Sequence, residues 1–209
     1  MDSKLIMTAT EAIKGLNLTN KVYLVTGGYA GLGTEAAKAL LKANAKIIIV
    51  GRNAETQQKF VTDLLNDKSL KISQNQIDAE QTMDLGSLES VSKFAKHIYQ
   101  KYEQIETLML NAGIMRTPAG KTKDGFEIQM GTNSKLKMIP KIRTGQIKIK
   151  KPEEGASTQV FCSVTPYSEL ENGCYYADCK IEPSSKSSNI AGDAKKLYDY
   201  CDEVTKKYQ

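Results

Sequence analysis

Apolar runs alternate with amphipathic segments along the first 110 residues of the chain. Four apolar runs predict buried strands, at residues 22–25, 46–50, 76–83 and 105–110. Between these runs, apolar residues recur at helical spacing over residues 32–43, 54–66 and 88–102. The second run, KIIIV, is too continuously apolar for a strand with one face in water. The alternation predicts parallel strands with right-handed crossovers, which is an α/β fold with a doubly wound, Rossmann-like sheet.

The turn between the first predicted strand and the first helix is rich in glycine. Its sequence is Thr26-Gly27-x-x-x-Gly31-x-Gly33. Gly27 allows a tight turn, Gly31 lets a pyrophosphate approach the backbone, and Gly33 lets the helix pack close to the strand. The N–H groups and the positive end of the helix then face the phosphates. A tight turn without a ligand is the alternative, but the strand before the turn and the helix after it favour a nucleotide site.

The other predicted strands also end in residues that suit a dinucleotide. Arg52 follows the second strand, where an acidic residue would bind a ribose 2′-hydroxyl. Its guanidinium suits a 2′-phosphate, which favours NADP over NAD, although Arg52 could also be a surface residue that caps a strand. Asp84 follows the third strand, in position for the adenine amino group, and Asn111 begins an Asn-Ala-Gly turn after the fourth. All these ends meet at one edge of a parallel sheet.

Composition and charge exclude several classes of function. The 209-residue chain is 40% hydrophobic and 25% charged, as in ordinary soluble globular proteins. We find no apolar run of membrane-spanning length and no targeting segment, so we expect a cytoplasmic protein. The four cysteines lack paired spacing and the chain has a single histidine, which predicts free thiols and no metal site. Residues 134–151 hold six lysines, one arginine and no interleaved aromatics, so we interpret them as a linker and expect no nucleic-acid partner.

Together these motifs resemble the cofactor half of a short-chain dehydrogenase/reductase. The segments GRN, MDLGSLESV, LMLNAGIM and DGFEIQMGTN are similar to the retinol dehydrogenase and WW-domain oxidoreductase branch. The resemblance runs from about residue 15 to Asn133 and implies a nicotinamide dinucleotide cofactor, NADP before NAD, with a small carbonyl or alcohol as substrate. It implies these cofactor-binding residues: Thr26, Gly27, Gly31, Leu32, Gly33, Arg52, Asp84, Leu85, Asn111, Ala112 and Gly113.

The resemblance implies a catalytic role for one residue of the first half. Asn133 matches the asparagine of the family's catalytic tetrad, in the helix that follows the fourth strand. The family continues with a fifth strand that carries a serine and with a Tyr-x-x-x-Lys helix, but here residues 134–151 follow instead. The resemblance resumes near Lys151 with segments like the family's last helices. The sheet is therefore expected to be truncated, with the catalytic middle missing.

A second Tyr-x-x-x-Lys pattern lies near the C-terminus. Tyr176 and Lys180 have this spacing, and Ser163 stands thirteen residues before the tyrosine, as in the family. A turn at Asn172-Gly173 precedes the pattern, and no apolar helix continues it. We therefore interpret Tyr176 and Lys180 as a decoy and expect the catalytic Tyr-Lys pair to be absent.

The sequence divides the chain into three regions and leaves three hypotheses about its function. We expect a Rossmann half over residues 1–133, a basic linker at a deletion junction over 134–151, and a helical remainder of the same domain over 152–209. The first hypothesis is an NADP(H)-dependent oxidoreductase with impaired or no turnover. The others are a non-catalytic nucleotide-binding or interaction protein, and an inactive splice product or gene-model fragment of a full-length reductase. Without a fifth strand, residues 105–110 would leave an apolar sheet edge exposed, which predicts self-association.

Overall fold

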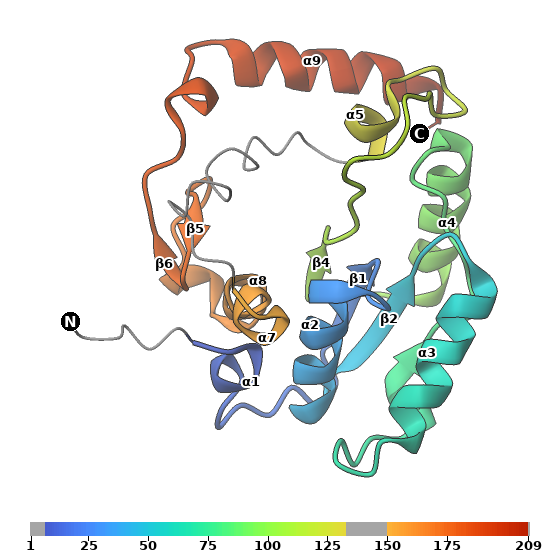
Figure 1. Ribbon diagram of the computed structural model, residues 1–209, viewed down its shortest axis with the longest axis vertical. Coiled ribbons are helices and arrows are strands. Elements are labelled where there is room, and N and C mark those ends of the chain that lie inside the picture. Colours follow the sequence, from blue (N-terminus) through green and yellow to red (C-terminus); the bar gives the residue numbers. More distant parts are fainter. Residues whose placement is uncertain (1–6, 133–149, 209) are drawn as a thin grey trace.

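A parallel sheet lies at the centre of the fold. The computed structural model describes residues 7–132 and 150–208. Within them, four strands pair in the order β3-β2-β1-β4 (Figure 1). The strands are β1 (Val22–Thr26), β2 (Lys46–Val50), β3 (Ile77–Asp78) and β4 (Thr107–Met109). All three pairings are parallel, with Tyr23 of β1 beside Ile47 of β2 and Thr107 of β4. The predicted doubly wound, Rossmann-like α/β fold is confirmed.

The two outer strands are shorter than the apolar runs predict. β3 keeps only two residues of the predicted 76–83, because the Gln57 side chain binds the carbonyl groups of Ala79 and Gln81 at 2.9 Å each. β4 keeps three residues of the predicted 105–110. The Asn111 N–H donates to the Met109 carbonyl at 2.9 Å and turns the chain out of the strand. Each outer strand pairs with one neighbour within the described chain, so its other side carries no strand partner there.

Helices cover both faces of the sheet. They are α2 (Gly31–Lys42), α3 (Ala54–Asn66) and α4 (Leu88–Lys101). Tyr23 and Val25 of β1 pack in the core on the α2 and α3 side, whereas Leu24 packs with α4 residues on the other side. This burial on both faces explains why the inner strands are continuously apolar. Ser87 caps the N-terminus of α4, where its side chain accepts a hydrogen bond from the Ser90 N–H at 3.3 Å.

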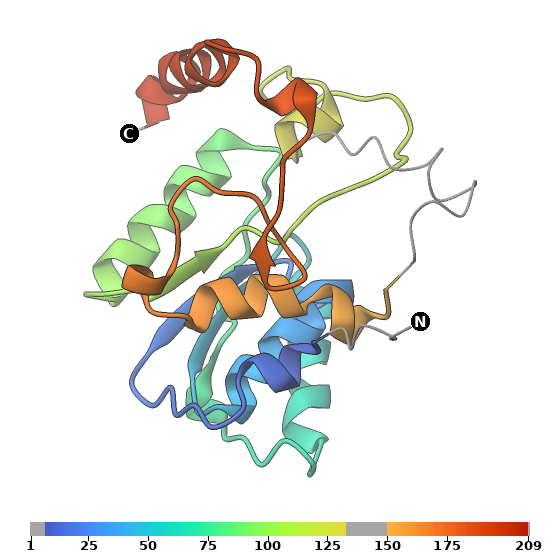
Figure 2. The same cartoon turned by 90° about the vertical axis from the view of Figure 1, so that its left-hand side faces the viewer.

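The segment after residue 149 packs partly on the same core and partly away from it. Ala156 and Val160 are fully buried in the core cluster that contains the α2 residues. The helix that carries Val160 packs beside α2 (Figure 2). By contrast, none of the described residues of the last long helix is buried, and this helix crosses the opposite end of the molecule from α1. The remaining elements are α1 (Ala9–Ala12), η1 (Gln74–Gln76), α5 (Ile128–Thr132), α7 (Pro152–Gly155), α8 (Ser157–Val164), η2 (Tyr167–Glu169), β5 (Tyr176–Ala177), β6 (Lys180–Ile181), η3 (Lys186–Ser188), α9 (Asp193–Thr205) and η4 (Lys206–Tyr208).

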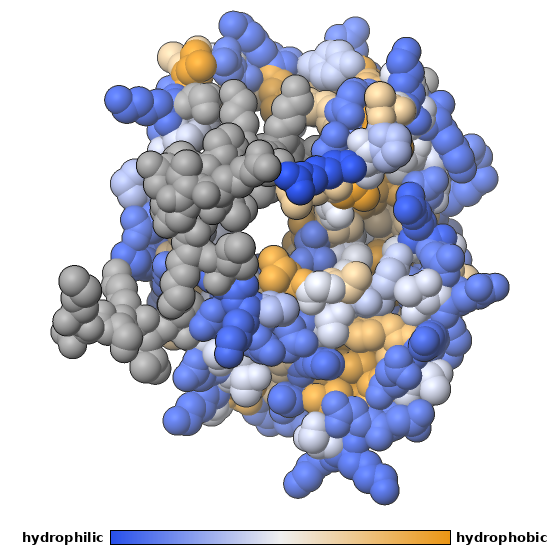
Figure 3. Space-filling view, in the orientation of Figure 1, coloured by the Kyte–Doolittle hydropathy of each residue, from blue (hydrophilic) through white to orange (hydrophobic). Residues whose placement is uncertain are grey.

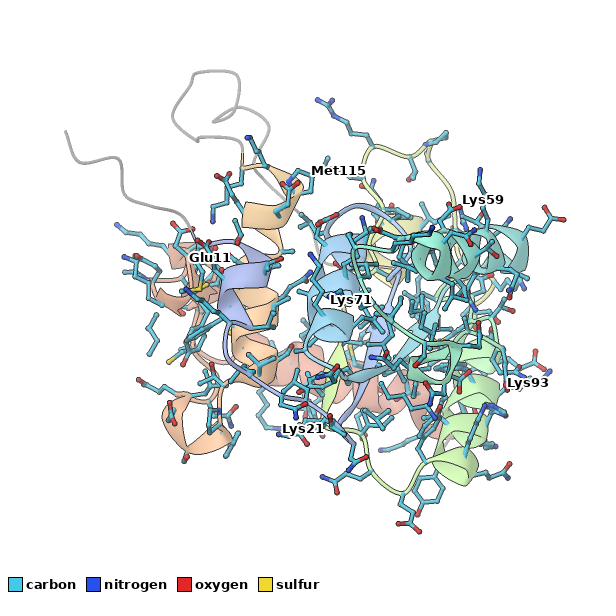
Figure 4. All side chains as sticks on the ribbon, turned by 90° about the horizontal axis from the view of Figure 1, so that it is seen from below. Glu11, Lys21, Lys59, Lys71, Lys93 and Met115 are labelled. Atoms are coloured by element: carbon cyan, nitrogen blue, oxygen red, sulfur yellow. The ribbon has the colours of Figure 1, made fainter. Side chains whose placement is uncertain are left out.

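The surface divides into a charged rim and a less polar middle. Figure 4 shows Lys59 and Lys93 projecting outward from α3 and α4. Figure 3 shows hydrophobic side chains around a hollow at the centre of one face. Across residues 7–132 and 150–208, no helix combines the length and apolar character that crossing a bilayer requires.

Candidate cofactor site

A cavity of about 490 Å³ opens beyond the carboxyl ends of the strands. It lies where β1 meets β4, the point at which the chain switches from one face of the sheet to the other. All the predicted cofactor residues except Gly33 line this cavity. These residues are Thr26, Gly27, Gly31, Leu32, Arg52, Asp84, Leu85, Asn111, Ala112 and Gly113. Four separate strand ends therefore contribute to one concave site.

The glycines of the first turn have two different structural roles. Gly27 and Gly31 adopt φ angles of 63° and 54°, a left-handed conformation that other residues rarely adopt. Apart from its chain neighbours and the backbone of its own helix, no described heavy atom lies within 4 Å of the place where a Cβ of Gly31 would stand, so its free side faces open space. A Cβ on Gly33 would instead lie 2.4 Å from the Gly27 carbonyl oxygen and 2.5 Å from Asn111 Nδ2. Gly33 is thus a packing residue behind the cavity wall, where the helix approaches the turn.

A hydrogen-bond network joins the glycine-rich turn to the end of β4. Asn111 Nδ2 donates to the carbonyl oxygens of Thr26 and Gly27, at 3.0 and 3.3 Å. The Ala112 N–H donates to Thr26 Oγ1 at 3.0 Å, and this hydroxyl donates to the Met109 carbonyl at 3.4 Å. Thr26 is only 3% exposed, so these bonds form away from water. The predicted cofactor residues of β1 and β4 therefore hold one another in place.

A buried glutamine holds together the segments that follow β2 and β3. The motifs did not include this residue. Gln57 of α3 is 1% exposed. Its Oε1 accepts from the Gly51 N–H at 2.9 Å, while its Nε2 binds the carbonyl groups of Ala79 and Gln81. One side chain thereby fixes the residue before Arg52 and the segment that leads to Asp84. The sequence held one indication of this role, because Gln57 is a polar residue on the apolar face of a helix.

The two charged residues of the site are held in different ways. Arg52 is exposed at the cavity wall, and within the described residues its guanidinium has no ion pair. Asp84 Oδ1 accepts from the Gly86 N–H at 2.9 Å, and Asp84 Oδ2 lies 3.8 Å from Lys123 Nζ. The backbone N–H of Asp84 donates to Ser90 Oγ at 3.0 Å. Asp84 is thus ordered by its own loop, whereas the Arg52 charge is available to an anion.

The cavity is also lined by nine residues outside the predicted cofactor set. Four of them are Tyr29, Ile114, Ile128 and Thr132. Tyr29 belongs to the glycine-rich turn, and its ring lies against Gly51 at the end of β2. The other three come from the chain that follows Asn111 and from α5, which close the cavity on the side of β4.

The predicted decoy residues lie outside this cavity. Tyr176 and Lys180 sit on the facing strands of the β5–β6 hairpin rather than one turn apart on a helix. The Tyr176 hydroxyl accepts from the Glu171 N–H at 2.8 Å, and Lys180 pairs with Glu182. Neither residue lines the cavity at the strand ends.

Ser163 and Asn133 are the remaining residues that the sequence singled out. Ser163 is 9% exposed on α8, where its hydroxyl donates to the Gln159 carbonyl at 2.7 Å. Asn133 and residues 134–149 of the basic segment lie outside the described residues. In the described part of the chain, no group of three or more His, Cys, Asp and Glu side chains is arranged to hold a metal ion.

A doubly wound sheet with a glycine-rich turn at its switch point defines the Rossmann-like class of α/β proteins. Residues 21–135, more than half of the chain, match the family model for short chain dehydrogenase. The chain therefore belongs to the short-chain dehydrogenase/reductase family, as its motifs predict.

The relatives that this chain matches are much longer than the matched region. The chain is 34% identical over 117 residues to short-chain dehydrogenase/reductase prx1 of Penicillium roqueforti, covering 56% of this chain and 32% of that protein. It is 33% identical over 116 residues to human retinol dehydrogenase 13, covering 56% and 34%. A crystal structure of a protein from Mycobacterium paratuberculosis is 29% identical, with a TM-score of 0.48, over 58% of this chain and 40% of that one. The chain spans about a third of the length of these curated relatives.

Proposed function

We propose that this chain is the cofactor-binding half of an NADP(H)-dependent oxidoreductase that acts on a carbonyl or alcohol, and that this form turns over slowly or not at all. The proposal rests on one observation: residues predicted from four separate strand ends line a single cavity. Relatives named as dehydrogenases and reductases support the type of reaction.

The residues of the cavity suit a dinucleotide. The turn from Gly27 to Gly31 presents backbone without side chains, and α2 points its N-terminus at the same place. Arg52 would hold a 2′-phosphate and Asp84 the adenine amino group, and the Asn111 turn would lie beside the adenine ribose and the nicotinamide side. When bound, the nicotinamide would supply hydride transfer to or from the substrate carbon.

The choice of NADP over NAD depends on Arg52 and can be measured by calorimetry. Arg52→Ala removes the only charge that we assign to the 2′-phosphate, so we expect about tenfold to a hundredfold weaker NADP⁺ binding and little change for NAD⁺. Lys59→Ala is the control, because it removes a positive charge from the outer face of α3, away from the cavity (Figure 4). Equal affinity of the unaltered protein for both cofactors would contradict the preference for NADP.

The lack of turnover is a separate part of the proposal. Asn133 is the one catalytic residue that we carry over from the family, and no Tyr-Lys pair accompanies it in our interpretation. NADPH consumption with small aldehydes and ketones should therefore stay near the background rate although NADPH binds. If turnover is found and Tyr176→Phe abolishes it, our interpretation of Tyr176 and Lys180 as a decoy is wrong.

Two alternative functions remain open because the sequence changes abruptly after Asn133, from the family's pattern to a lysine-rich segment. One is a non-catalytic nucleotide-binding or interaction protein, with the basic linker at residues 134–151 as its contact surface. The other is an inactive splice product or gene-model fragment, and sequencing transcripts across the codons for Gln129 to Gly155 tests it. Extra in-frame sequence with a serine strand and a Tyr-x-x-x-Lys helix would assign the enzyme activity to the longer form.

A further inference from the structure

Tyr29 bridges the two strand ends that form one side of the cavity. It belongs to the glycine-rich turn after β1, and its ring lies against Gly51 at the end of β2. A Cβ on Gly51 would stand 2.2 Å from Tyr29 Cε1 and 2.4 Å from the Tyr29 hydroxyl oxygen. Such distances do not occur between non-bonded atoms, so the ring in this position leaves no room for a side chain at position 51.

The Tyr29 ring is held against the residue that precedes Arg52. Gly51 directly precedes Arg52, and Tyr29, Gly51 and Arg52 all line the same cavity. The ring is half-buried and packs against the main hydrophobic core, while the Gln57 side chain accepts a hydrogen bond from the Gly51 N–H. Both the ring and the backbone that it touches are therefore positioned before any ligand binds.

The Tyr29 hydroxyl has no hydrogen-bond partner among the described residues. A phenol O–H can donate to a phosphate oxygen, and a hydrogen bond to a charged group is stronger than one to a neutral group. A guanidinium beside it supplies the positive charge that a phosphate dianion needs.

We propose that Tyr29 is a second specificity residue for the 2′-phosphate, whose hydroxyl donates to this group beside Arg52. This inference rests on the proposed binding of NADP(H), which it deepens by a residue outside the predicted set. The 2′-hydroxyl of NAD is neutral and offers fewer acceptor oxygens, so loss of the phenol O–H should weaken NADP⁺ much more than NAD⁺.

Calorimetric titration of Tyr29→Phe with NADP⁺ and NAD⁺ tests the inference. The substitution keeps the ring against Gly51 and removes only the hydroxyl. We expect about tenfold weaker binding of NADP⁺ and about the same affinity for NAD⁺. Adenosine 2′-monophosphate and adenosine 5′-monophosphate provide smaller probes, and only the first should lose affinity. Tyr99→Phe is the control, because this tyrosine is 87% exposed on α4 and does not line the cavity.

The outcomes separate the two proposals. If the unaltered protein binds NADP⁺ no better than NAD⁺, the proposed function loses its cofactor preference and the inference fails with it. If the unaltered protein prefers NADP⁺ and Arg52→Ala removes that preference, but Tyr29→Phe keeps it, only the role of Tyr29 is overturned. Equal weakening of both cofactors in Tyr29→Phe would also overturn it, because Tyr29 would then shape the turn rather than select the phosphate.

Discussion

Two glycines of one turn illustrate how a single residue type meets two different demands. Gly31 needs freedom of backbone conformation, with φ at 54° and open space beside its Cα. Gly33 needs small size, because the Gly27 carbonyl and the Asn111 amide occupy the space of a Cβ. The first demand concerns what enters the cavity and the second concerns how the cavity is built. Substitution can separate them.

Gly33→Ala should destabilise the fold more than Gly31→Ala. A methyl group added at position 33 would displace backbone and the Asn111 network, which costs about 1–3 kcal/mol, whereas an alanine at position 31 adopts a left-handed conformation at a cost of about 1 kcal/mol. Denaturant unfolding measures both. Gly31→Ala should nevertheless lose nucleotide affinity, because its methyl group projects into the cavity.

A third glycine provides the control for backbone strain. Gly125 has φ at 88° and open space like Gly31, but it does not line the cavity. Gly125→Ala should therefore cost similar stability and leave NADP⁺ affinity unchanged. If Gly31→Ala binds NADP⁺ as well as Gly125→Ala does, the pyrophosphate does not pass over Gly31.

At the scale of elements, the end of α4 is tied to the short strand β3. Asp78 is 8% exposed, and its Oδ2 accepts from the Tyr102 hydroxyl at 2.5 Å and from Lys101 Nζ at 2.9 Å. Lys46 Nζ in turn lies 5.2 Å from the centre of the Tyr102 ring. A strand of two residues has few ladder bonds of its own, so this cluster contributes to holding β3 beside β2.

The Asp78 cluster predicts a pH dependence of stability. Burial raises the pKa of Asp78, but hydrogen bonds from Tyr102, Lys101 and the Glu80 N–H outweigh it and leave the pKa below its ordinary value. A carboxyl whose pKa is lower in the folded state stabilises the fold above its unfolded pKa, about pH 4, and this stabilisation is lost as the pH falls through the folded pKa.

Asp78→Asn tests this dependence against the unaltered protein. We expect the substitution to cost about 1–3 kcal/mol near neutral pH, because it removes charge-assisted bonds at a buried position. The difference in free energy of unfolding between the two proteins should narrow below about pH 4. A difference that stays constant from neutral pH to about pH 3 would show that the Asp78 charge is not what holds β3.

The elements that the sequence predicts well are those whose residues are buried on both faces. The bounds of β2 and α3 are as predicted, because continuous apolar runs and helical spacing leave few alternatives. The β5–β6 hairpin is different. Its turn uses Asp178 and Cys179 with φ at 53° and 60°, where Asn-Gly would be typical, so no local pattern indicated it.

The residues of the candidate site also fall into those that the sequence predicts and those that it does not. The glycines, Arg52 and the Asn111 turn follow from motifs, because each residue type is required by a local conformation or charge. Gln57 and Tyr29 do not, since their roles depend on backbone beyond the ends of β2 and β3 that comes near them only in the folded chain. Motifs thus predicted the residues of the cavity wall but missed two that keep it in shape.

At the scale of the whole molecule, the sheet ends in an open edge. In the described residues no strand pairs with the outer side of β4, and Leu108 and Leu110 are 55% and 75% exposed. The start of the strand is engaged by α8, where Thr107 Oγ1 donates to the Ser163 carbonyl at 3.2 Å. Unpaired backbone groups beside apolar side chains form a template for another strand. We therefore propose that copies of this chain associate through β4.

Sedimentation at several protein concentrations tests this association. The unaltered protein should show a mass that rises with concentration, and Leu108→Lys should shift it toward the monomer, because a charge on an edge strand opposes pairing. Tyr198→Lys is the control, since this residue is 71% exposed on α9, away from β4. If both variants lower the mass equally, exposed apolar surface in general drives association rather than the strand edge. If the unaltered protein is a monomer at every concentration, the open edge is protected and the proposed association is wrong.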